Sequence, residues 1–169
     1  YSACLVNLGN NVVGIDENVE IVDNLNKGIV PLREPQLEEI VKKNIKSGQL
    51  KYTTDFQYLA DCDIIWITID TPVDSQDKAN TNKIFAYIKK ALPYVKNGSL
   101  IIASSQLPVG TSTKISKFIK ANRSDFKFDY AYVPENLRLG EAVKSFMKPS
   151  RIVIGIDNSE RKDELVQIF

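Results

Sequence analysis

The sequence predicts an α/β domain built around a mostly parallel β-sheet. Apolar runs of strand length alternate along the chain with stretches whose apolar residues recur at helical spacing. Two of these runs, residues 63–69 and 99–103, are apolar at most positions, as expected for strands buried on both faces of a parallel sheet. No repeat, linker or low-complexity segment interrupts the alternation. Residues 1–169 are therefore expected to form one domain of βαβ units with right-handed crossovers.

The composition is typical of a single globular domain and argues against several classes of partner. The 169 residues are 43% hydrophobic and 25% charged, and 22 basic and 21 acidic residues are interspersed to a net charge of +1. This charge pattern predicts no nucleic-acid or membrane partner. The apolar runs fall far short of the roughly 20 residues that span a bilayer. No signal-peptide pattern opens the chain, so a cytoplasmic protein is expected.

The two cysteines, Cys4 and Cys62, have no CxxC spacing, and the chain contains no histidine. A histidine-dependent triad or zinc centre is therefore excluded within these residues, and no metal site is predicted. Both thiols are expected to be buried in a protein of the reducing cytosol.

Helix caps and apolar periodicity predict the elements of the N-terminal part. Asn18 and Asp55 are suited to begin helices, because their side chains accept hydrogen bonds from amides that a helix leaves unpaired. Gly9 and Gly48 are suited to end helices, because glycine readily adopts the left-handed conformation that follows a helix. In chain order we expect a helix at 1–8, a strand at 12–16, a helix after Asn18, a helix from about residue 34, a strand at 50–53 and a short helix at 55–59.

The remaining elements follow from apolar runs that polar loops interrupt. Pro134 ends the strand before it, because proline has no amide to donate to a β-ladder. In chain order we expect a strand at 63–69, a helix carrying Ile84, Phe85, Ile88 and Leu92, a strand at 99–103, a helix capped by Thr111, an aromatic strand at 128–132, a strand at 151–155 and a terminal helix.

Three polar loops follow predicted strands and are expected to share one edge of the sheet. They are Asp70-Thr71-Pro72, Ser104-Ser105-Gln106 and residues 133–140. Ligands of open α/β sheets bind beyond the carboxyl ends of the strands, so the three loops together predict one binding crevice. Each loop taken alone is equally compatible with an ordinary solvated turn.

Three charged residues are best placed for chemistry. Glu135 comes directly after a strand, where a partly buried carboxylate suits general-base catalysis; alternatively it is an exposed acid or a helix cap. Arg138 can bind phosphate through paired hydrogen bonds or form a surface ion pair with Glu141. Asp16 ends an apolar strand, where a carboxylate accepts hydrogen bonds from ribose hydroxyls and disfavours a 2′-phosphate, unless it only caps a surface turn. The glycine-rich dinucleotide fingerprint is absent and would be expected before Tyr1.

Several short motifs occur in a specific order, namely Gly14-Ile15-Asp16, Glu34-Pro35-x-Leu37-Glu38, Thr71-Pro72, Leu107-Pro108-Val109-Gly110-Thr111, Pro134-Glu135-x-Leu137-Arg138-x-Gly140-x-Ala142 and Arg151-Ile152-Val153-Ile154-Gly155. Each is weak alone, but their joint order and spacing is specific. The chain resembles the NAD-binding domain of the UDP-glucose/GDP-mannose dehydrogenase family from residue 1 to about residue 155. The resemblance implies a Rossmann-like, doubly wound, mostly parallel sheet that lacks its first strand. Residues 1–169 would then be part of an N-terminal NAD-binding domain.

The resemblance implies a two-step oxidation with two NAD⁺, in which the C6 hydroxyl of a UDP-sugar such as UDP-glucose becomes a carboxylic acid. A cysteine traps the intermediate aldehyde, and water cleaves the thioester that the second hydride transfer leaves. In this family pattern Asp16 would hold the adenosine ribose. Thr71 and Ser105 would line the NAD site.

The resemblance also assigns residues to the substrate side of the site. Glu135 would activate the water for thioester hydrolysis, and Leu137 and Arg138 would hold the sugar nucleotide, largely through backbone groups. Many members have threonine where Gln106 stands, helping to position the water, a role that a glutamine amide could share. A second glutamate is common where Leu139 stands, and leucine cannot perform acid–base chemistry.

Further departures from the family pattern leave two alternatives open. Asp70 stands where glycine is usual and Asn136 where phenylalanine is usual, and the family's catalytic cysteine and lysine match no residue here. The chain could be a non-catalytic NAD- or nucleotide-binding or assembly module, or a domain of a β-hydroxyacid or 6-phosphogluconate-type dehydrogenase. As part of a full-length member of the resembled family, it would act in polysaccharide biosynthesis within a homo-oligomer, and these residues alone would be inactive.

Overall fold

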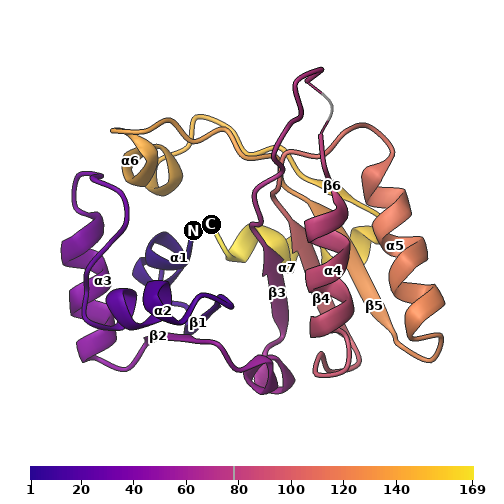
Figure 1. The fold of residues 1–169 in the computed structure, drawn as a ribbon, viewed down its shortest axis with the longest axis horizontal. Coiled ribbons are helices and arrows are strands. Elements are labelled where there is room, and N and C mark those ends of the chain that lie inside the picture. The colour runs from indigo at the N-terminus through magenta and orange to yellow at the C-terminus, as the bar shows by residue number, and fades with distance from the viewer. Residues whose placement is uncertain (78) are drawn as a thin grey trace. The chain divides into compact units, whose positions relative to one another are not determined.

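The computed structural model describes residues 1–77 and 79–169, which form two compact units (Figure 1). Unit 1 comprises Tyr1–Phe56, Asn136–Ile152 and Lys162–Phe169, and unit 2 comprises Gln57–Glu135 and Val153–Arg161. Each unit has its own sheet, and five of the six strands lie in parallel pairs. The predicted α/β class with mostly parallel strands is confirmed.

Unit 1 is built on a parallel pair of strands, β1 and β2, whose register pairs Val12 with Leu50 and Ile15 with Thr53. Its elements are α1 (Ser2–Asn7), β1 (Val12–Ile15), α2 (Val19–Asn26), α3 (Leu37–Lys46), β2 (Leu50–Thr53), α6 (Ala142–Met147) and α7 (Lys162–Gln167). Apolar side chains from α1, α2, α3 and β2 form one buried cluster, made of Ala3, Val6, Val22, Val41, Leu50 and Tyr52.

Two of the predicted helix caps of unit 1, Gly9 and Asn18, are present. After α1, Gly9 takes φ +96°, its amide donates to the Val6 carbonyl, and the Asn10 amide donates to the Leu5 carbonyl. This pair of hydrogen bonds is the Schellman arrangement that ends many helices. At the start of α2, the Asn18 side chain accepts hydrogen bonds from the amides of the second and third helical residues.

Gly14, in the middle of β1, is packed against the ring of Tyr52 in β2. A Cβ atom at this position would lie 2.5 Å from Cδ1 and 2.7 Å from Cε1 of the ring. Tyr52 cannot easily move away, because it is buried and its hydroxyl is hydrogen-bonded to the Ser2 hydroxyl at 2.7 Å. Glycine is therefore the residue that lets the two strands pack here.

We expect Gly14→Ala to lower the free energy of unfolding by about 1–3 kcal/mol, the usual cost of overpacking a buried site. Urea denaturation of the full-length protein measures the change. Gly155→Ala is a matched control, because its Cβ would meet nothing closer than the Tyr132 carbonyl at 3.9 Å. An equal loss of stability in both variants would contradict the steric explanation.

Unit 2 contains a four-stranded sheet of order β3-β4-β5-β6, in which β3, β4 and β5 are parallel and β6 runs antiparallel to β5. Its elements are β3 (Ile64–Ile67), α4 (Asn82–Ala91), β4 (Ser99–Ala103), α5 (Thr111–Asn122), β5 (Phe128–Tyr132), β6 (Gly155–Ile156) and a 3-10 turn, η2 (Ser159–Arg161). A second 3-10 turn, η1 (Phe56–Asp61), precedes β3. All five residues of β4 are buried, which makes this strand the centre of the unit.

The helices α4 and α5 pack beside each other against this sheet (Figure 1). Phe85 of α4 meets Phe118 of α5 edge to face, with ring centroids 5.1 Å apart. Ile84 and Ile88 of α4 and Ile115 of α5 are fully or almost fully buried, as their helical spacing predicts.

Three sequence predictions need correction, and one helix was missed. The strand predicted at 151–155 is only Gly155–Ile156, and it is antiparallel. Thr111 is the first helical residue of α5 rather than its cap, because Gly110 occupies the cap position at φ +84°. The strand predicted at 63–69 covers only Ile64–Ile67 and is mostly half-buried, since β3 is an edge strand of its sheet. The short helix α6 was not predicted.

Within residues 1–77 and 79–169, no helix combines the length and the apolar character needed to cross a bilayer.

Candidate functional site

The carboxyl ends of β3, β4 and β5 lie at one edge of the unit 2 sheet. Their register aligns Ile67 with Ala103 and Ala103 with Tyr132. The ladder continues past the strands, because the Ser104 amide donates to the Ile67 carbonyl and the Val133 amide donates to the Ala103 carbonyl, both at 2.9 Å. The three polar loops that follow these strands therefore leave the same edge, as predicted.

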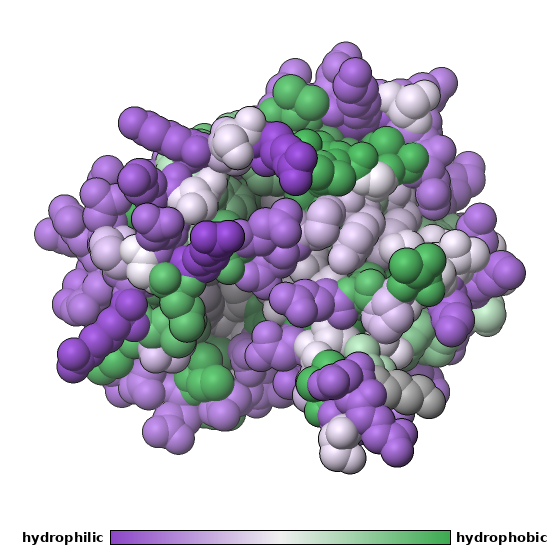
Figure 2. Space-filling view, turned by 90° about the horizontal axis from the view of Figure 1, so that it is seen from above, coloured by the Kyte–Doolittle hydropathy of each residue, from purple (hydrophilic) through white to green (hydrophobic). Residues whose placement is uncertain are grey.

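Apolar side chains are exposed among polar ones on the side of the molecule seen in Figure 2. In unit 2, independently of that view, two exposed apolar residues belong to the loops that leave this sheet edge: Val73 follows β3, and Val109, with a relative exposure of 105%, follows β4.

Two neighbouring serines at the end of β4 have different surroundings. Ser104 is 1% exposed, and its hydroxyl accepts a hydrogen bond of 2.7 Å from the indole nitrogen of Trp66. Ser105 is 5% exposed, and its hydroxyl has no hydrogen-bond partner in the described part of the chain. The Ser105 carbonyl accepts a hydrogen bond from the Tyr132 hydroxyl at 3.3 Å, which links the loop to β5.

Thr71, in the loop after β3, also has a buried hydroxyl without a partner among the described residues. A buried hydroxyl that makes no hydrogen bond costs about 1–3 kcal/mol, so such groups normally meet a ligand or water. Thr71 and Ser105 thus supply two polar contacts at the edge where a ligand is expected. The third such hydroxyl, that of Ser116, lies within α5 and was not a predicted site residue.

Glu135 follows β5 by three residues, and its side chain is half-buried. Gln106 follows β4 by three residues and is exposed. Both side chains are therefore accessible at the same sheet edge, where a carboxylate can accept a proton and an amide can hold a water molecule.

Asp16 lies in unit 1, one residue after β1, and its amide donates to the Thr53 carbonyl at 3.2 Å. One carboxylate oxygen accepts a hydrogen bond of 2.8 Å from the amide of Asn18, the cap of α2. The alternative interpretation of Asp16 as a turn-capping acid is therefore correct for that oxygen. The other oxygen has no hydrogen-bond partner within residues 1–77 and 79–169, and can accept one from a ligand.

Leu137 and Arg138 also lie in unit 1, in the segment before α6. Leu137 is half-buried and Arg138 is exposed. The Arg138 carbonyl accepts a hydrogen bond of 3.1 Å from the Glu141 amide, which closes a turn with Gly140 at φ +85°. The alternative ion pair between Arg138 and Glu141 is not among the ion pairs of the described residues.

Glu34 contacts this turn, a contact that the sequence analysis did not anticipate. Its carboxylate accepts hydrogen bonds from the amides of Gly140 and Val143 at 2.7 and 3.3 Å. The only signal in the sequence was the Glu34-Pro35 motif. No local pattern could reveal a partner 106 residues away.

Comparison with known proteins decides the family. The model of the UDP-glucose/GDP-mannose dehydrogenase family, NAD binding domain, matches residues 1–169. The chain belongs to this family. It is 34% identical over 163 residues to a UDP-glucose 6-dehydrogenase of Rickettsia conorii, covering 96% of this chain and 37% of that protein.

Solved structures of two dehydrogenases share the fold. A GDP-mannose dehydrogenase from Pseudomonas aeruginosa has a TM-score of 0.92 and 25% identity, and the match covers 99% of this chain and 40% of that one. A UDP-glucose dehydrogenase from Pyrobaculum islandicum has a TM-score of 0.89 and 28% identity, with the same coverage. The chain thus spans about two fifths of the length of these relatives.

NAD is the cofactor of this domain family. In unit 2, Thr71 and Ser105 present buried hydroxyls that have no partner among the described residues, which suits such a ligand. In unit 1, Asp16 retains one carboxylate oxygen that can accept hydrogen bonds from it. Vicinal ribose hydroxyls and phosphate oxygens are complementary to these groups.

The two serines after β4 allow a paired test of this fit. We expect Ser105→Ala to weaken NAD⁺ binding about 3–10-fold, by loss of one neutral hydrogen bond, without lowering stability, because no protein hydrogen bond is lost. Ser104→Ala should instead lower stability by about 1–2 kcal/mol, because it leaves the Trp66 indole unpaired, and should leave NAD⁺ affinity unchanged. Calorimetry and urea denaturation measure the two quantities. The reverse pattern would refute the role of the Ser105 hydroxyl.

Neither cysteine of this domain has the properties of a nucleophile. Burial raises the pKa of the Cys4 thiol, and burial together with Asp61 raises the pKa of the Cys62 thiol. Both thiols are therefore protonated at neutral pH, and the thiolate is the reactive form. This agrees with the family resemblance, which matches neither residue to the catalytic cysteine.

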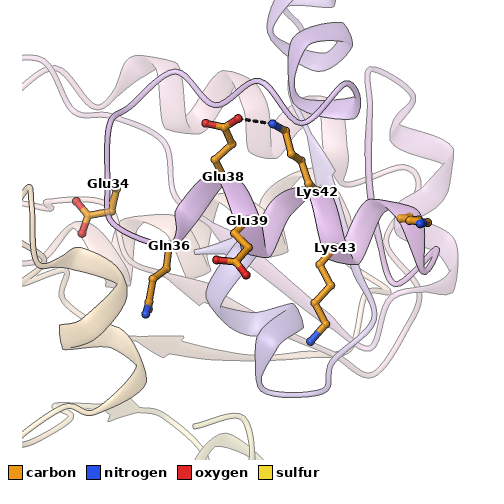
Figure 3. Close-up of a pocket in the computed structure, with 7 residues that line it drawn as sticks. Glu34, Gln36, Glu38, Glu39, Lys42 and Lys43 are labelled. Atoms are coloured by element: carbon orange, nitrogen blue, oxygen red, sulfur yellow. Dashed lines mark hydrogen bonds and ion pairs between the residues drawn. The ribbon is translucent and has the colours of Figure 1, made fainter.

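A shallow hollow on unit 1 runs along α3 (Figure 3) and is separate from the predicted ligand residues of the dehydrogenase domain. Glu38 and Lys42 form an exposed ion pair one helical turn apart. Exposed pairs of this kind contribute little to stability. The hollow is lined by Glu34, Gln36, Glu38, Glu39, Lys42, Lys43 and Lys46, a mixture of charges typical of a solvated helix face.

Proposed function

We propose that the full-length protein oxidises the C6 hydroxyl of a UDP-sugar, UDP-glucose or a related one, to the uronic acid, and that this chain is its NAD-binding part. The observation that carries the proposal is the composition of one sheet edge. Thr71 and Ser105, whose buried hydroxyls have no partner within residues 1–77 and 79–169, flank the edge that also carries Glu135. A cofactor contact and a carboxylate base at one edge suit an oxidation that ends in hydrolysis. The relatives of similar sequence, at up to 34% identity, are UDP-glucose 6-dehydrogenases.

The proposed reaction balances as one alcohol, two NAD⁺ and one water giving one acid, two NADH and two protons. When bound, NAD⁺ supplies the acceptor for each of the two hydrides. Glu135 takes a proton from the water that attacks the thioester, and the exposed Gln106 amide orients that water. The attacked thioester belongs to the family's catalytic cysteine, which matches no residue of this chain.

The remaining proposed roles concern binding. Asp16 holds the adenosine ribose through the carboxylate oxygen that Asn18 does not occupy. The negative charge of Asp16 disfavours a 2′-phosphate, so NAD⁺ is bound in preference to NADP⁺. Leu137 and Arg138 hold the sugar nucleotide, and the exposed guanidinium of Arg138 is available to phosphate oxygens.

The same proposal includes the setting of the protein. A cytoplasmic location follows from the composition and from two free cysteines, and a homo-oligomer of the full-length protein follows from the family resemblance. The assignment of residues 1–169 to one N-terminal NAD-binding domain stays a prediction.

Turnover of the full-length protein tests the proposal. With NAD⁺, we expect UDP-glucose or a close analogue to be oxidised and two NADH to form per sugar. UDP-N-acetylmannosamine and GDP-mannose should be assayed beside it, because related structures are dehydrogenases of these compounds. Oxidation of 6-phosphogluconate or a β-hydroxyacid instead would refute the proposed substrate class.

A non-catalytic NAD-binding or assembly module is the second candidate. It is favoured by the departures from the family pattern at Asp70, Gln106 and Leu139. Leu139 stands where a second glutamate is common, and it is 78% exposed and has no acid–base group. Binding of NAD⁺ without oxidation of any sugar nucleotide by the full-length protein would support this candidate and refute the enzyme.

A further inference from the structure

Glu34 lies in the loop between α2 and α3, and its side chain turns away from α3 towards the segment that carries α6 (Figure 3). Oε2 accepts the amide hydrogen of Gly140 at 2.7 Å, and Oε1 accepts that of Val143 at 3.3 Å. Both partners belong to unit 1, so these contacts lie within a single compact unit. Two oxygens of one carboxylate thus bind two backbone amides more than 100 residues away.

The two amides have different positions in the local structure. Gly140 lies within the turn that the Glu141 amide closes on the Arg138 carbonyl, and its φ of +85° is one that other residues rarely adopt. Val143 is the second residue of α6, where helix amides have no intrahelical acceptor. The side chain of Glu141, which occupies the cap position, makes no capping bond, so Glu34 caps the helix from outside its own segment.

The contact suits the chemistry of a carboxylate. Hydrogen bonds from amides to a carboxylate are charge-assisted and stronger than neutral ones. A negative charge at the start of a helix is also favourable, because the first amides point towards it. A glutamine at this position keeps one acceptor oxygen, but its NH₂ group cannot accept the second amide hydrogen.

The far end of α6 is held by apolar contacts that do not involve Glu34. Phe146, near this end, is buried. The ring of Phe146 meets Tyr1 edge to face at a centroid distance of 5.5 Å and lies 5.7 Å from Phe169. Loss of the Glu34 contact is therefore expected to release the turn before α6, while these apolar contacts keep the helix docked.

We propose that Glu34 is a positioning residue that fixes the sugar-nucleotide segment, Leu137 and Arg138, by binding the turn that follows it. The inference rests on the proposed function, which assigns this segment to the substrate. Arg138 is itself the first residue of the turn that Glu34 holds, so a shift of Gly140 moves Arg138 directly. The expected defect therefore concerns the sugar nucleotide and not NAD⁺.

Steady-state kinetics of Glu34→Gln in the full-length protein tests the proposal. We expect the KM for UDP-glucose, or for the sugar nucleotide that the wild-type protein oxidises, to rise about tenfold, as for loss of a hydrogen bond to a charged group. The KM for NAD⁺ and kcat should change less than about twofold. Glu34→Asp, which keeps the charge and both oxygens on a shorter side chain, should give an intermediate KM.

Glu38→Gln is the matched control, because it removes another carboxylate from the same hollow. Among the described residues, the Glu38 carboxylate is paired only with the exposed Lys42. It should leave both KM values unchanged. Backbone hydrogen exchange gives a second readout that does not depend on turnover. The amides of Gly140 and Val143 should exchange faster in Glu34→Gln than in the wild-type protein or in Glu38→Gln.

The outcomes separate the inference from the function on which it rests. Faster exchange with an unchanged KM for the sugar nucleotide would show that Glu34 only supports the helix, and would overturn the inference. Equal rises in both KM values would also overturn it, because the defect would be general. A wild-type protein that oxidises no sugar nucleotide would refute the proposed function itself, and with it the substrate role of Glu34.

Discussion

Glu135→Gln in the full-length protein is expected to slow release of the uronic acid about 10²–10⁴-fold, the usual contribution of a general base. Formation of the aldehyde should change much less, because the first hydride transfer needs no attack by water. The half-buried side chain at the end of β5 can meet both water and substrate. Glutamine preserves its shape and can still hold a water, but it cannot take up the proton.

Rapid-quench kinetics distinguishes the two steps. In Glu135→Gln, two NADH per active site should form in a burst, after which turnover stalls with the sugar bound to the enzyme as a thioester. Glu141→Gln is a suitable control, since this exposed carboxylate lies six positions further along and its side chain makes no capping bond. Equal slowing of aldehyde formation and acid release would contradict the general-base role.

Asp16→Ala is expected to raise the Kd for NAD⁺ about 10–100-fold, because hydrogen bonds to a charged acceptor contribute about 1.5–3 kcal/mol. Asp16→Ala also removes the acceptor of the Asn18 amide hydrogen bond at 2.8 Å, so a disturbed turn would contribute to the loss of NAD⁺ affinity. Asp16→Asn separates the two causes. Its side-chain oxygen can still accept the Asn18 amide, while the charge that favours ribose hydroxyls over a 2′-phosphate is lost.

Calorimetric titration with NAD⁺ and NADP⁺ measures both effects. We expect Asp16→Asn to bind NAD⁺ more weakly than wild type and to discriminate less against NADP⁺. Asp23→Asn is the control, because Asp23 is an exposed acid on the next helix, α2. An unchanged Kd for NAD⁺ in both Asp16 variants would remove Asp16 from the cofactor site.

Much of the fold could be predicted because the relevant signals are local. The strands β1, β2, β4 and β5 were predicted to within one residue from apolar runs, since each run is contiguous in the chain. The Asn18 cap was predicted for the same reason, because its side chain binds amides only two and three residues away.

The helix α6 could not be predicted in this way. It has only six residues, too few for a clear periodic pattern. Its stability depends on partners that are distant in sequence, namely Glu34 at its start and the rings of Tyr1 and Phe169 around Phe146. The prediction of a strand at 151–155 was wrong for the complementary reason. An apolar run specifies neither the strand with which it pairs nor the number of residues that pair.

The sequence by itself determined the α/β class, the alternation of strands and helices, and the three polar loops that leave the edge formed by β3, β4 and β5. These features follow from hydrophobic periodicity and turn chemistry, which act over a few residues. The tertiary structure alone decided which of two adjacent serines has a hydroxyl without a partner in the described part of the chain, because Trp66 binds Ser104 from 38 residues away. It alone also decided that Glu34 holds the turn beside Arg138, since a hydrogen bond depends on distance in space and not on distance along the chain.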